Sequence, residues 1–479
     1  MALEGLIPLF LILLGAALVI PVKTISDKGM KGMLLMLFAV ALGFNTWLLW
    51  NIVFGAVDSY SVNVFVADGA SLFVTEVILL IGLMSLIYSI KYMAKTPLKT
   101  GVYYGIFALF IASMIGTTLA TEAVALYAFL ETITVTSAVL ILYGRGAALR
   151  STMIYLVIAI FGAILVLVGI FFMYTFTGTT LITGASDLPF LTDFQRLLIS
   201  SFFFVGFGIK AGVVPFGLLW LPPAHSDAPT PISAILSGIM IKVGAFAMVR
   251  TIYIFYPGLD ILILTVSSIG IASVLIGGIL AFFQNDIKRL LAFSSISQIG
   301  YIILSFGLGT LVGIEGGLFH LLNHAIFKSL LFLTAGNVIL RVNTRNIREM
   351  GGLWNRMPIT LFVFLIGMFS IIGWIPGFSG YQSKTIIHHA TIAAGFPIFG
   401  ILADIGTIIT ILYLGRAIIE IFIKRPKNPS PIKNVKEAPV TMLIPTIILA
   451  LLCIVIGVFP GLVSSILEIA SNVLGGLIS

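Results

Sequence analysis

The sequence predicts an all-α membrane protein with about fourteen transmembrane helices, and two observations support this fold class. Hydrophobic residues make up 59% of the 479 residues and charged residues only 9%, whereas a soluble domain carries about a quarter charged residues. Apolar runs of about 18 residues or more recur along the chain, and each is long enough to cross a bilayer as a helix. The chain is therefore predicted to be a multi-pass membrane protein.

Fourteen apolar runs are separated by polar, proline or glycine breaks. They begin near residues 3, 31, 70, 101, 121, 151, 192, 229, 259, 289, 311, 357, 396 and 440. The first run contains Glu4 and no basic stretch, so we expect a membrane helix there rather than a cleaved signal peptide. The connections are too short to build a soluble core, and the single Cys453 cannot ligate an iron–sulfur cluster by itself. We therefore expect no cofactor or redox centre in this chain.

The positive charges predict an orientation in the cell membrane. Most of the 26 lysine and arginine residues follow odd-numbered runs. They are Lys23, Lys28, Lys31, Lys91, Lys95, Lys99, Arg145, Arg150, Lys288, Arg289, Arg341, Arg345, Arg348, Arg356, Lys424, Arg425, Lys427, Lys433 and Lys436. By the positive-inside rule these connections are cytoplasmic, which places both termini outside. Because loop residues account for most of the net charge of +8, we expect no nucleic-acid partner.

Ionisable side chains also occur inside the apolar runs, where they are costly and normally face a bundle interior or a wet cavity. They are Glu131 in the fifth run, Lys210 in the seventh, Lys242 in the eighth, His320, His324 and Lys328 in the eleventh, and Lys384 in the twelfth. Burial disfavours the charged form of a lysine, a nearby carboxylate favours it, and histidine changes charge near neutrality. This inventory predicts a transmembrane proton path and no residues that catalyse covalent chemistry.

Two of these lysines lie beside helix-breaking residues. Pro215 follows Lys210, and Pro376 and Gly377 precede Lys384. Proline inside a span removes a backbone hydrogen bond and unwinds the helix locally. Broken helices at corresponding places in two halves indicate inverted repeats with an ion site at mid-membrane. We therefore predict two inverted five-helix repeats, each with a broken helix. The predicted parts are residues 1–100 (three helices), 101–255 (first repeat), 256–425 (second repeat) and 426–479 (the fourteenth helix).

The segment "HLLNHAIFKSLLF" places His320, His324 and Lys328 at intervals of four, so they share one helix face about 6 Å apart. Two histidines at this spacing also occur in metal sites. No glutamate or aspartate in the segment completes a ligand set, and Lys328 would repel a cation. A polar relay is therefore favoured over a metal site, and structural hydrogen bonding is the remaining alternative.

Two acidic residues inside the runs are candidates for accessory roles. Glu76 in the third run either serves the path or bonds two helices together. Asp404 in the thirteenth run extends a polar helix face. His388 and His389 are expected near the outer surface, where a metal site is the less favoured interpretation.

Three long segments carry a resemblance to a known family. They are "WLPPAHSDAPTPISAILSGIMIKVGAFAMVR" (220–250), "NDIKRLLAFSSISQIGYI" (285–302) and "GGLFHLLNHAIFKSLLFLTAGNVI" (316–339). The chain resembles, over residues 70–425, the antiporter-like membrane subunits of respiratory complex I, of Mrp-type cation/proton antiporters and of energy-converting membrane-bound hydrogenase or sulfane reductase complexes. It departs from many members in the twelfth run, which has "GWIPGFSGYQSK" in place of a Gly-x-Pro-Pro sequence.

The resemblance implies a position in the family's proton path for each buried residue. These are Glu131 and Lys210 as the paired glutamate and lysine, Lys242 as the connecting lysine, His320, His324 and Lys328 as the polar positions of the eleventh helix, and Lys384 as the terminal lysine. The segment "HSDAPTP" matches the loop that joins the seventh and eighth helices, which adds His225 as an accessory candidate.

By this resemblance the chain is expected to move protons, or to exchange H⁺ for Na⁺, as one membrane subunit of a redox-driven complex. Expected partners are other membrane subunits, including further antiporter-like subunits, together with peripheral redox subunits on the cytoplasmic side and lipid. The chain would then belong to an oxidoreductase without holding its redox centre. Two alternatives stay open: a component of a stand-alone Mrp-type antiporter, and a structural member that no longer pumps.

Overall fold

The computed structural model describes residues 2–19, 27–95, 100–144, 147–182, 191–425 and 435–478. Five of the predicted loop cations lie outside the described residues: Lys23, Lys99, Arg145, Lys427 and Lys433. The α-helices are α1 (Ile7–Val19), α2 (Asp27–Val53), α3 (Gly69–Tyr92), α4 (Thr100–Leu119), α5 (Ala123–Leu142), α6 (Ala148–Thr177), α7 (Asp193–Ala211), α8 (Gly217–Asp227), α9 (Thr230–Ile235), α10 (Ile241–Ile252), α11 (Asp260–Phe282), α12 (Ile287–Gly307), α13 (Leu311–Val342), α14 (Pro358–Ile372), α15 (Ser379–Ala393), α16 (Pro397–Ile418), α17 (Val440–Val458) and α18 (Gly461–Gly475).

Shorter elements complete the described chain. Two π-helical turns, η4 (Leu236–Met240) and η7 (Ile419–Ile423), continue α9 and α16. The 3₁₀ turns are η1 (Ala2–Leu6), η2 (Met93–Lys95), η5 (Tyr253–Phe255) and η6 (Ile347–Glu349), and the two strands of one antiparallel hairpin are β1 (Tyr60–Val62) and β2 (Phe65–Ala67).

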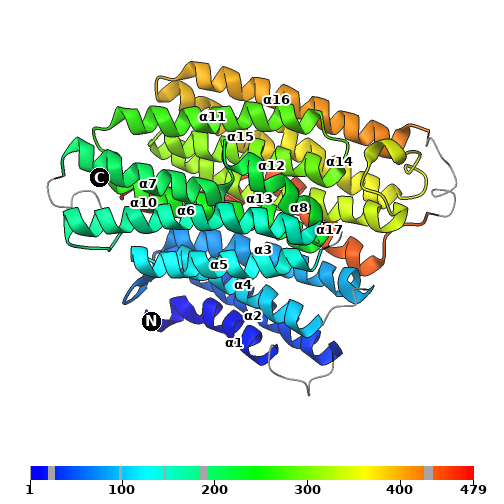
Figure 1. Cartoon of the computed structure of the whole chain (residues 1–479), viewed down its shortest axis with the longest axis horizontal. Helices are drawn as coiled ribbons and strands as arrows, with labels where there is room; N and C mark the ends of the chain where they lie inside the picture. Colours follow the sequence, from blue (N-terminus) through cyan, green and yellow to red (C-terminus); the bar gives the residue numbers. More distant parts are fainter. Residues whose placement is uncertain are drawn as a thin grey trace.

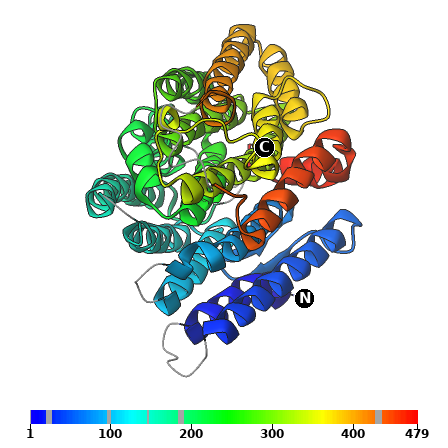
Figure 2. The same cartoon turned by 90° about the vertical axis from the view of Figure 1, so that its right-hand side faces the viewer.

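The long helices run side by side, with α1 and α2 at one edge of the bundle and α16 at the opposite edge (Figure 1). Figure 2 shows the same bundle turned by 90°. In the part of the chain that the structure describes, 12 helices are long and apolar enough to cross a membrane, and three shorter apolar helices accompany them. The multi-pass α-helical fold is confirmed, whereas the count of fourteen, the two repeats and the four-part division of the chain stay predictions.

The C-terminal segment differs from the prediction. The sequence predicted one helix after residue 440, but the structure has α17 and then α18, separated by Phe459 and Pro460. Proline cannot continue the hydrogen-bond ladder of a preceding helix, so the chain turns there. The new helix packs against α3 and α13. It was missed because its apolar residues alternate with Ser464, Ser465 and Glu468, which lowers the hydropathy of the segment.

A buried ion pair fixes the start of α3. Asp68 caps this helix by accepting a hydrogen bond from the backbone N–H of Ser71. Its other carboxylate oxygen pairs with Arg250 of α10 at 2.8 Å, and the same guanidinium donates to the carbonyl oxygen of Thr118. Arg250 lies inside α10 and is only 5% exposed. A buried charge is tolerated when it is paired and its remaining donors find acceptors, as the Arg250 guanidinium does here.

Both predicted helix breaks are present, and they are built alike. A glycine in the left-handed region follows the first half of each broken helix: Gly212 (φ +77°) follows α7 and Gly373 (φ +71°) follows α14. A second glycine lies in the first turn of the second half. A Cβ atom at Gly217 would collide with the carbonyl oxygen of Gly212, and one at Gly380 would collide with that of Ser370. Each second half therefore starts in direct contact with the end of the first.

Helix α13 runs through the interior of the bundle. It is 32 residues long and packs against α3, α9, α12, α14, α15, α17 and α18. Protein therefore surrounds most of its length. His320, His324 and Lys328 are each 0% exposed. The polar face predicted for this helix thus points into the bundle, away from any lipid.

Candidate functional site

The buried ionisable residues predicted for the path lie inside the bundle. Their exposed fractions are between 0% and 8% for Lys210, Lys242, His320, His324, Lys328 and Lys384, and Glu131 is half-buried. They come from α5, α7, α10, α13 and α15. Helix α7 packs against α10, and α13 packs against both the π-turn before α10 and α15. The fold therefore joins the two broken helices through the middle of α13.

A threonine hydroxyl bridges Glu131 and Lys210. Thr134 lies one turn after Glu131 on α5, and its Oγ1 is 3.3 Å from Glu131 Oε1. Lys210 Nζ donates to the same Thr134 oxygen from the last turn of α7. Among the described ion pairs there is none that joins Glu131 and Lys210 directly. The Thr134 hydroxyl therefore lies between the acid and the base, and its one proton is directed to either the Leu130 carbonyl oxygen at 3.0 Å or the Glu131 carboxylate at 3.3 Å.

A π-helical turn holds the ammonium group of Lys242. Nζ of Lys242 donates to the carbonyl oxygen of Ser237, five residues earlier in η4. Such a turn displaces a carbonyl from the regular i→i+4 ladder and is frequent at functional sites. The Ser237 hydroxyl lies 2.6 Å from that of Ser295 on α12. A Cβ at Gly238 would collide with the Ser329 hydroxyl, so only glycine lets η4 approach α13 this closely.

The three residues of the α13 face contact different partners. His320 Nδ1 lies 3.0 Å from the Ser383 hydroxyl on α15, and its Nε2 lies 3.2 Å from Gln298 Oε1 on α12. The ring of His324 is 6.1 Å from that of His320, and both of its nitrogens lack a hydrogen-bond partner among the described residues. Lys328 Nζ donates to the Ser294 hydroxyl on α12. The face is thus linked to both neighbouring helices.

The metal alternative finds no support in this part of the bundle. Within the described ranges no three His, Cys, Asp or Glu side chains are grouped so that they could hold a metal ion. Both nitrogens of His320 already face Ser383 and Gln298. The relay role of the histidine pair stays a prediction.

Lys384 is held by the second helix break. Its Nζ donates to the carbonyl oxygen of Ile372 at 3.0 Å and to Thr407 Oγ1 at 3.1 Å. The Ile372 carbonyl is the last of α14, where the helix leaves its acceptors free. The ammonium group also lies 4.3 Å from the ring centroid of Tyr301, a cation–π distance. Tyr301 in turn donates to the Ala403 carbonyl oxygen at 2.6 Å.

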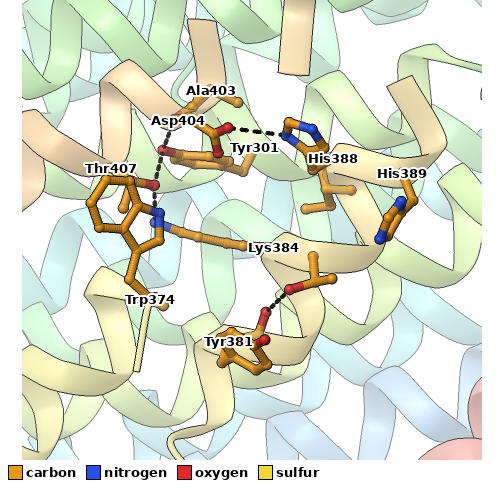
Figure 3. Close-up of a pocket in the computed structure, with 12 residues that line it drawn as sticks. Tyr301, Trp374, Tyr381, Lys384, His388, His389, Ala403, Asp404 and Thr407 are labelled. Carbon is orange, nitrogen blue, oxygen red and sulfur yellow. Dashed lines mark hydrogen bonds and ion pairs between the residues drawn. The ribbon is translucent and has the colours of Figure 1, made fainter. Parts of the chain in front are cut away.

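A cavity of about 260 Å³ opens beside Lys384. Figure 3 shows the Lys384 side chain pointing toward Thr407, with Trp374 and Tyr301 beside them, and Asp404 joined to His388. His388 Nδ1 lies 3.1 Å from Asp404 Oδ2. The accessory candidate Asp404 therefore faces His388 rather than a residue of its own helix.

The other two accessory candidates lie in different surroundings. Glu76 accepts hydrogen bonds of 2.7 Å from Asn45 and from Thr46, both on α2, which supports the helix-bonding interpretation. His225 is 0% exposed and stacks on Phe332 of α13 at 5.2 Å. Its ring nitrogens have no hydrogen-bond partner within the described part of the chain. His225 thus lies against the same central helix as the histidine pair.

Sequence reasoning missed the uncharged groups that join the ionisable ones. They are Thr134, Ser237, Gln298, Ser294, Ser383 and Thr407. Thr134 could have been found, because it lies three residues after Glu131 on one helix face. Ser237 lies five residues before Lys242, but a regular helix would not present its carbonyl to that lysine. The other four come from neighbouring helices, and only tertiary packing brings them to the lysines and histidines.

Sequence reasoning also missed an ion-pair network at the junction of α8 and α9. Arg345 pairs with Asp286 at 3.2 Å and with Asp227 at 3.4 Å. Ser151 of α6 donates to Asp227 at 2.6 Å, and Lys288 of α12 donates to the Ala228 carbonyl oxygen at 2.5 Å. The segment after His225 is thereby tied to three other elements, which fixes the position of the preceding helix.

Comparisons with known proteins agree with these features. Residues 120–410 match the family model described as the transmembrane region of the NADH:quinone oxidoreductase/Mrp antiporter family. The chain is 30% identical over 406 residues to NADH-quinone oxidoreductase subunit N of Desulforudis audaxviator, which covers 81% of each protein. It is 34% identical over 439 residues to a Na⁺/H⁺ antiporter subunit of Alkalihalophilus pseudofirmus, covering 85% of this chain and 54% of that protein. The chain thus spans about half the length of that antiporter protein.

A solved structure supports the same relationship. In the membrane-bound sulfane sulfur reductase, an archaeal respiratory membrane complex, one chain superposes with a TM-score of 0.84 and 28% identity, covering 95% of this chain and 76% of that one. The matched family region runs from α5 to α16 and therefore contains both helix breaks. By sequence and fold, this chain belongs to the antiporter-like membrane subunit family of NADH:quinone oxidoreductase and the Mrp antiporters.

Proposed function

We propose that this chain is a proton-translocating membrane subunit of a redox-driven multisubunit complex. One observation carries the proposal: buried titratable side chains lie inside the bundle from Lys210 through α13 to Lys384, and hydroxyl or amide groups contact several of them. An ionisable group inside a membrane span is costly, and a connected series of such groups is typical of proton relays.

The proposed route starts on the cytoplasmic side. Protons are taken up near Lys242, pass along the His320, His324 and Lys328 face and leave through Lys384. Glu131 and Lys210 set the affinity of Lys242 for its proton. Since neighbouring ammonium groups repel each other, protonation of one lysine favours release from the next. The lysine and arginine pattern supports cytoplasmic odd-numbered connections and outer termini.

The proposed partners are other membrane subunits, including antiporter-like ones, with peripheral redox subunits on the cytoplasmic side. Resemblance to the quinone oxidoreductase subunit and to the sulfane sulfur reductase chain supports this assignment. The similarity to the Na⁺/H⁺ antiporter protein favours a second candidate, a stand-alone Mrp-type antiporter that exchanges H⁺ for Na⁺. Purification of the native complex separates the two, because only the first predicts co-eluting redox subunits.

The lysine at the first helix break tests the proton-path assignment. Lys210→Ala removes the cation that Thr134 bridges to Glu131, so proton pumping by the complete complex in vesicles should fall by about a hundredfold. The matched control is Lys91→Ala, an exposed lysine at the end of α3, which should pump normally. Undiminished pumping by Lys210→Ala in an intact complex would remove Lys210 from the path.

A further inference from the structure

The cavity beside Lys384 contains a second pair of proton-binding side chains, further from the interior. Lys384 is 8% exposed, whereas the side chains of His388 and Asp404 are 34% and 48% exposed. The cavity lining includes all three residues (Figure 3). The lysine is thus buried, whereas both members of the pair are partly exposed.

Helix geometry places the pair one turn beyond the lysine. His388 follows Lys384 by four residues on α15, so both side chains lie on one face. Asp404 precedes Thr407 by three residues on α16, so these two also share a face. Because Lys384 bonds to Thr407 and His388 pairs with Asp404, α15 and α16 are joined by two parallel contacts, one turn apart.

Packing holds His388 in place against α16. A Cβ atom at Gly400 would lie 3.2 Å from His388 Nδ1 and 2.6 Å from the Thr391 hydroxyl, so the glycine lets the imidazole approach the helix. An ion pair of this exposure contributes little to stability. Stabilisation of the fold therefore does not explain well why His388 and Asp404 are paired on the wall of a cavity.

The charged and titratable groups around His388 are few. On α15 they are Tyr381, Lys384 and His389, on α16 Asp404, and on α12 Tyr301. From α13, which also packs against α15, His320 faces Ser383. Asp404 is the carboxylate in the cavity lining, so it is the group that stabilises a positive charge on the imidazole.

We propose that His388 and Asp404 form a proton-release pair between Lys384 and the outer aqueous phase. The proton leaves the Lys384 ammonium through water in the cavity and binds the His388 imidazole, while Asp404 stabilises the imidazolium. The proton then passes to the outer solvent and regenerates neutral His388. The volume of about 260 Å³ suffices for the connecting water, since one water molecule needs roughly 10–15 Å³. This inference rests on the proposed function.

The test uses the complete complex in sealed vesicles, with the pH on the release side varied between about 6 and 8 and the uptake side held constant. In the native complex the pumping rate should depend on release-side pH in the range where histidine changes charge. His388→Gln should lower pumping about tenfold and abolish this dependence, because imidazole no longer takes up the proton. Asp404→Asn should shift the profile to lower pH, and Asp404→Glu should restore it.

Two further variants make the outcomes distinguishable. His389→Gln, which changes the adjacent histidine outside the ion pair, should retain the native rate and profile. If Lys384→Gln stops pumping while His388→Gln keeps both rate and profile, the release pair is refuted and the proposed function stands. If Lys384→Gln pumps normally, the proposed function itself fails.

A chemical probe tests the pair without altering its fold. In a His389→Gln complex, diethyl pyrocarbonate added to the release side should modify His388, since His225, His320 and His324 are fully buried. Pumping should fall in proportion to the modification of His388, measured by peptide mass mapping, and return with hydroxylamine. Complete modification with unchanged pumping would contradict the proposal.

Discussion

The two broken helices share one backbone design and differ in what surrounds their lysines. In both, the ammonium group lies near the C-terminal end of the first half-helix, where the helix dipole favours a cation. Lys210 belongs to the last turn of α7 itself, whereas Lys384 reaches the end of α14 from the second half, α15. The first lysine is bridged by Thr134 to the carboxylate of Glu131, whereas the second bonds to a backbone carbonyl and to Thr407.

If the proposed function holds, this difference gives the two similar sites different tasks. A carboxylate one hydroxyl away makes the charge on Lys210 depend on the state of Glu131. The hydrogen-bond acceptors of Lys384 are uncharged, and its ammonium group lies against the Tyr301 ring. A cavity beside Lys384 offers a route for its proton to leave. The first break is thus suited to control affinity, and the second to release.

The largest expected effect concerns the carboxylate of the first site. Glu131→Gln keeps a hydrogen-bonding group beside Thr134 but removes the charge, so proton pumping should fall by about a hundredfold. The matched variant is Glu76→Gln, because Glu76 bonds to α2 rather than to a lysine. Vesicle pumping assays that find equal losses for both variants would contradict the special role of the first site.

The shared backbone design predicts equal damage at both breaks. Gly217→Ala and Gly380→Ala each force a Cβ atom into a backbone carbonyl, and such overpacking costs about 1–3 kcal/mol. Thermal unfolding in detergent should therefore shift to lower temperature for both. Gly43→Ala in α2 serves as the control, since its Cβ would meet nothing within 4 Å. If one variant lowers the unfolding temperature much more than the other, the two helix breaks are not equivalent.

The smallest expected effect separates the two hydroxyl contacts. Thr134→Val removes the group that bridges Lys210 to Glu131, so pumping should fall about tenfold, equivalent to a loss of about 1.4 kcal/mol. Thr407→Val should cost only about threefold, because Lys384 keeps the Ile372 carbonyl and the Tyr301 ring. Thr134→Ser should restore the rate. A greater loss of pumping in Thr407→Val than in Thr134→Val would contradict this difference between the two sites.

Much of the fold could be predicted because a membrane imposes strict rules on a sequence. About twenty apolar residues per helix and proline or glycine at each break leave few alternatives, so α7 to α8 and α14 to α15 were located in advance. α18 escaped because an amphipathic helix at the bundle edge carries no strong hydropathy signal. The buried pair of Arg250 and Asp68 gave no sequence signal because its members lie 182 residues apart.

The candidate site could be predicted only in its charged members. A lysine in a lipid-length apolar run is conspicuous because it is costly, but a serine or threonine there is not. Ser294, Ser383 and Thr407 therefore gave no signal, although each contacts a lysine or histidine of the row. His388 and Asp404 lie on different helices, and their pairing depends on how α15 and α16 pack.

The hydroxyl bridges have a consequence for the sense of transport. An O–H group donates and accepts with equal ease, so a proton path of the proposed kind, with threonine and serine hydroxyls at its lysines, would conduct equally well both ways. Nothing in Thr134, Ser294 or Thr407 acts as a one-way valve. In the proposed path, direction would then depend on which end is loaded with protons, so the path would expel protons when driven by a reaction and admit them when driven by a gradient.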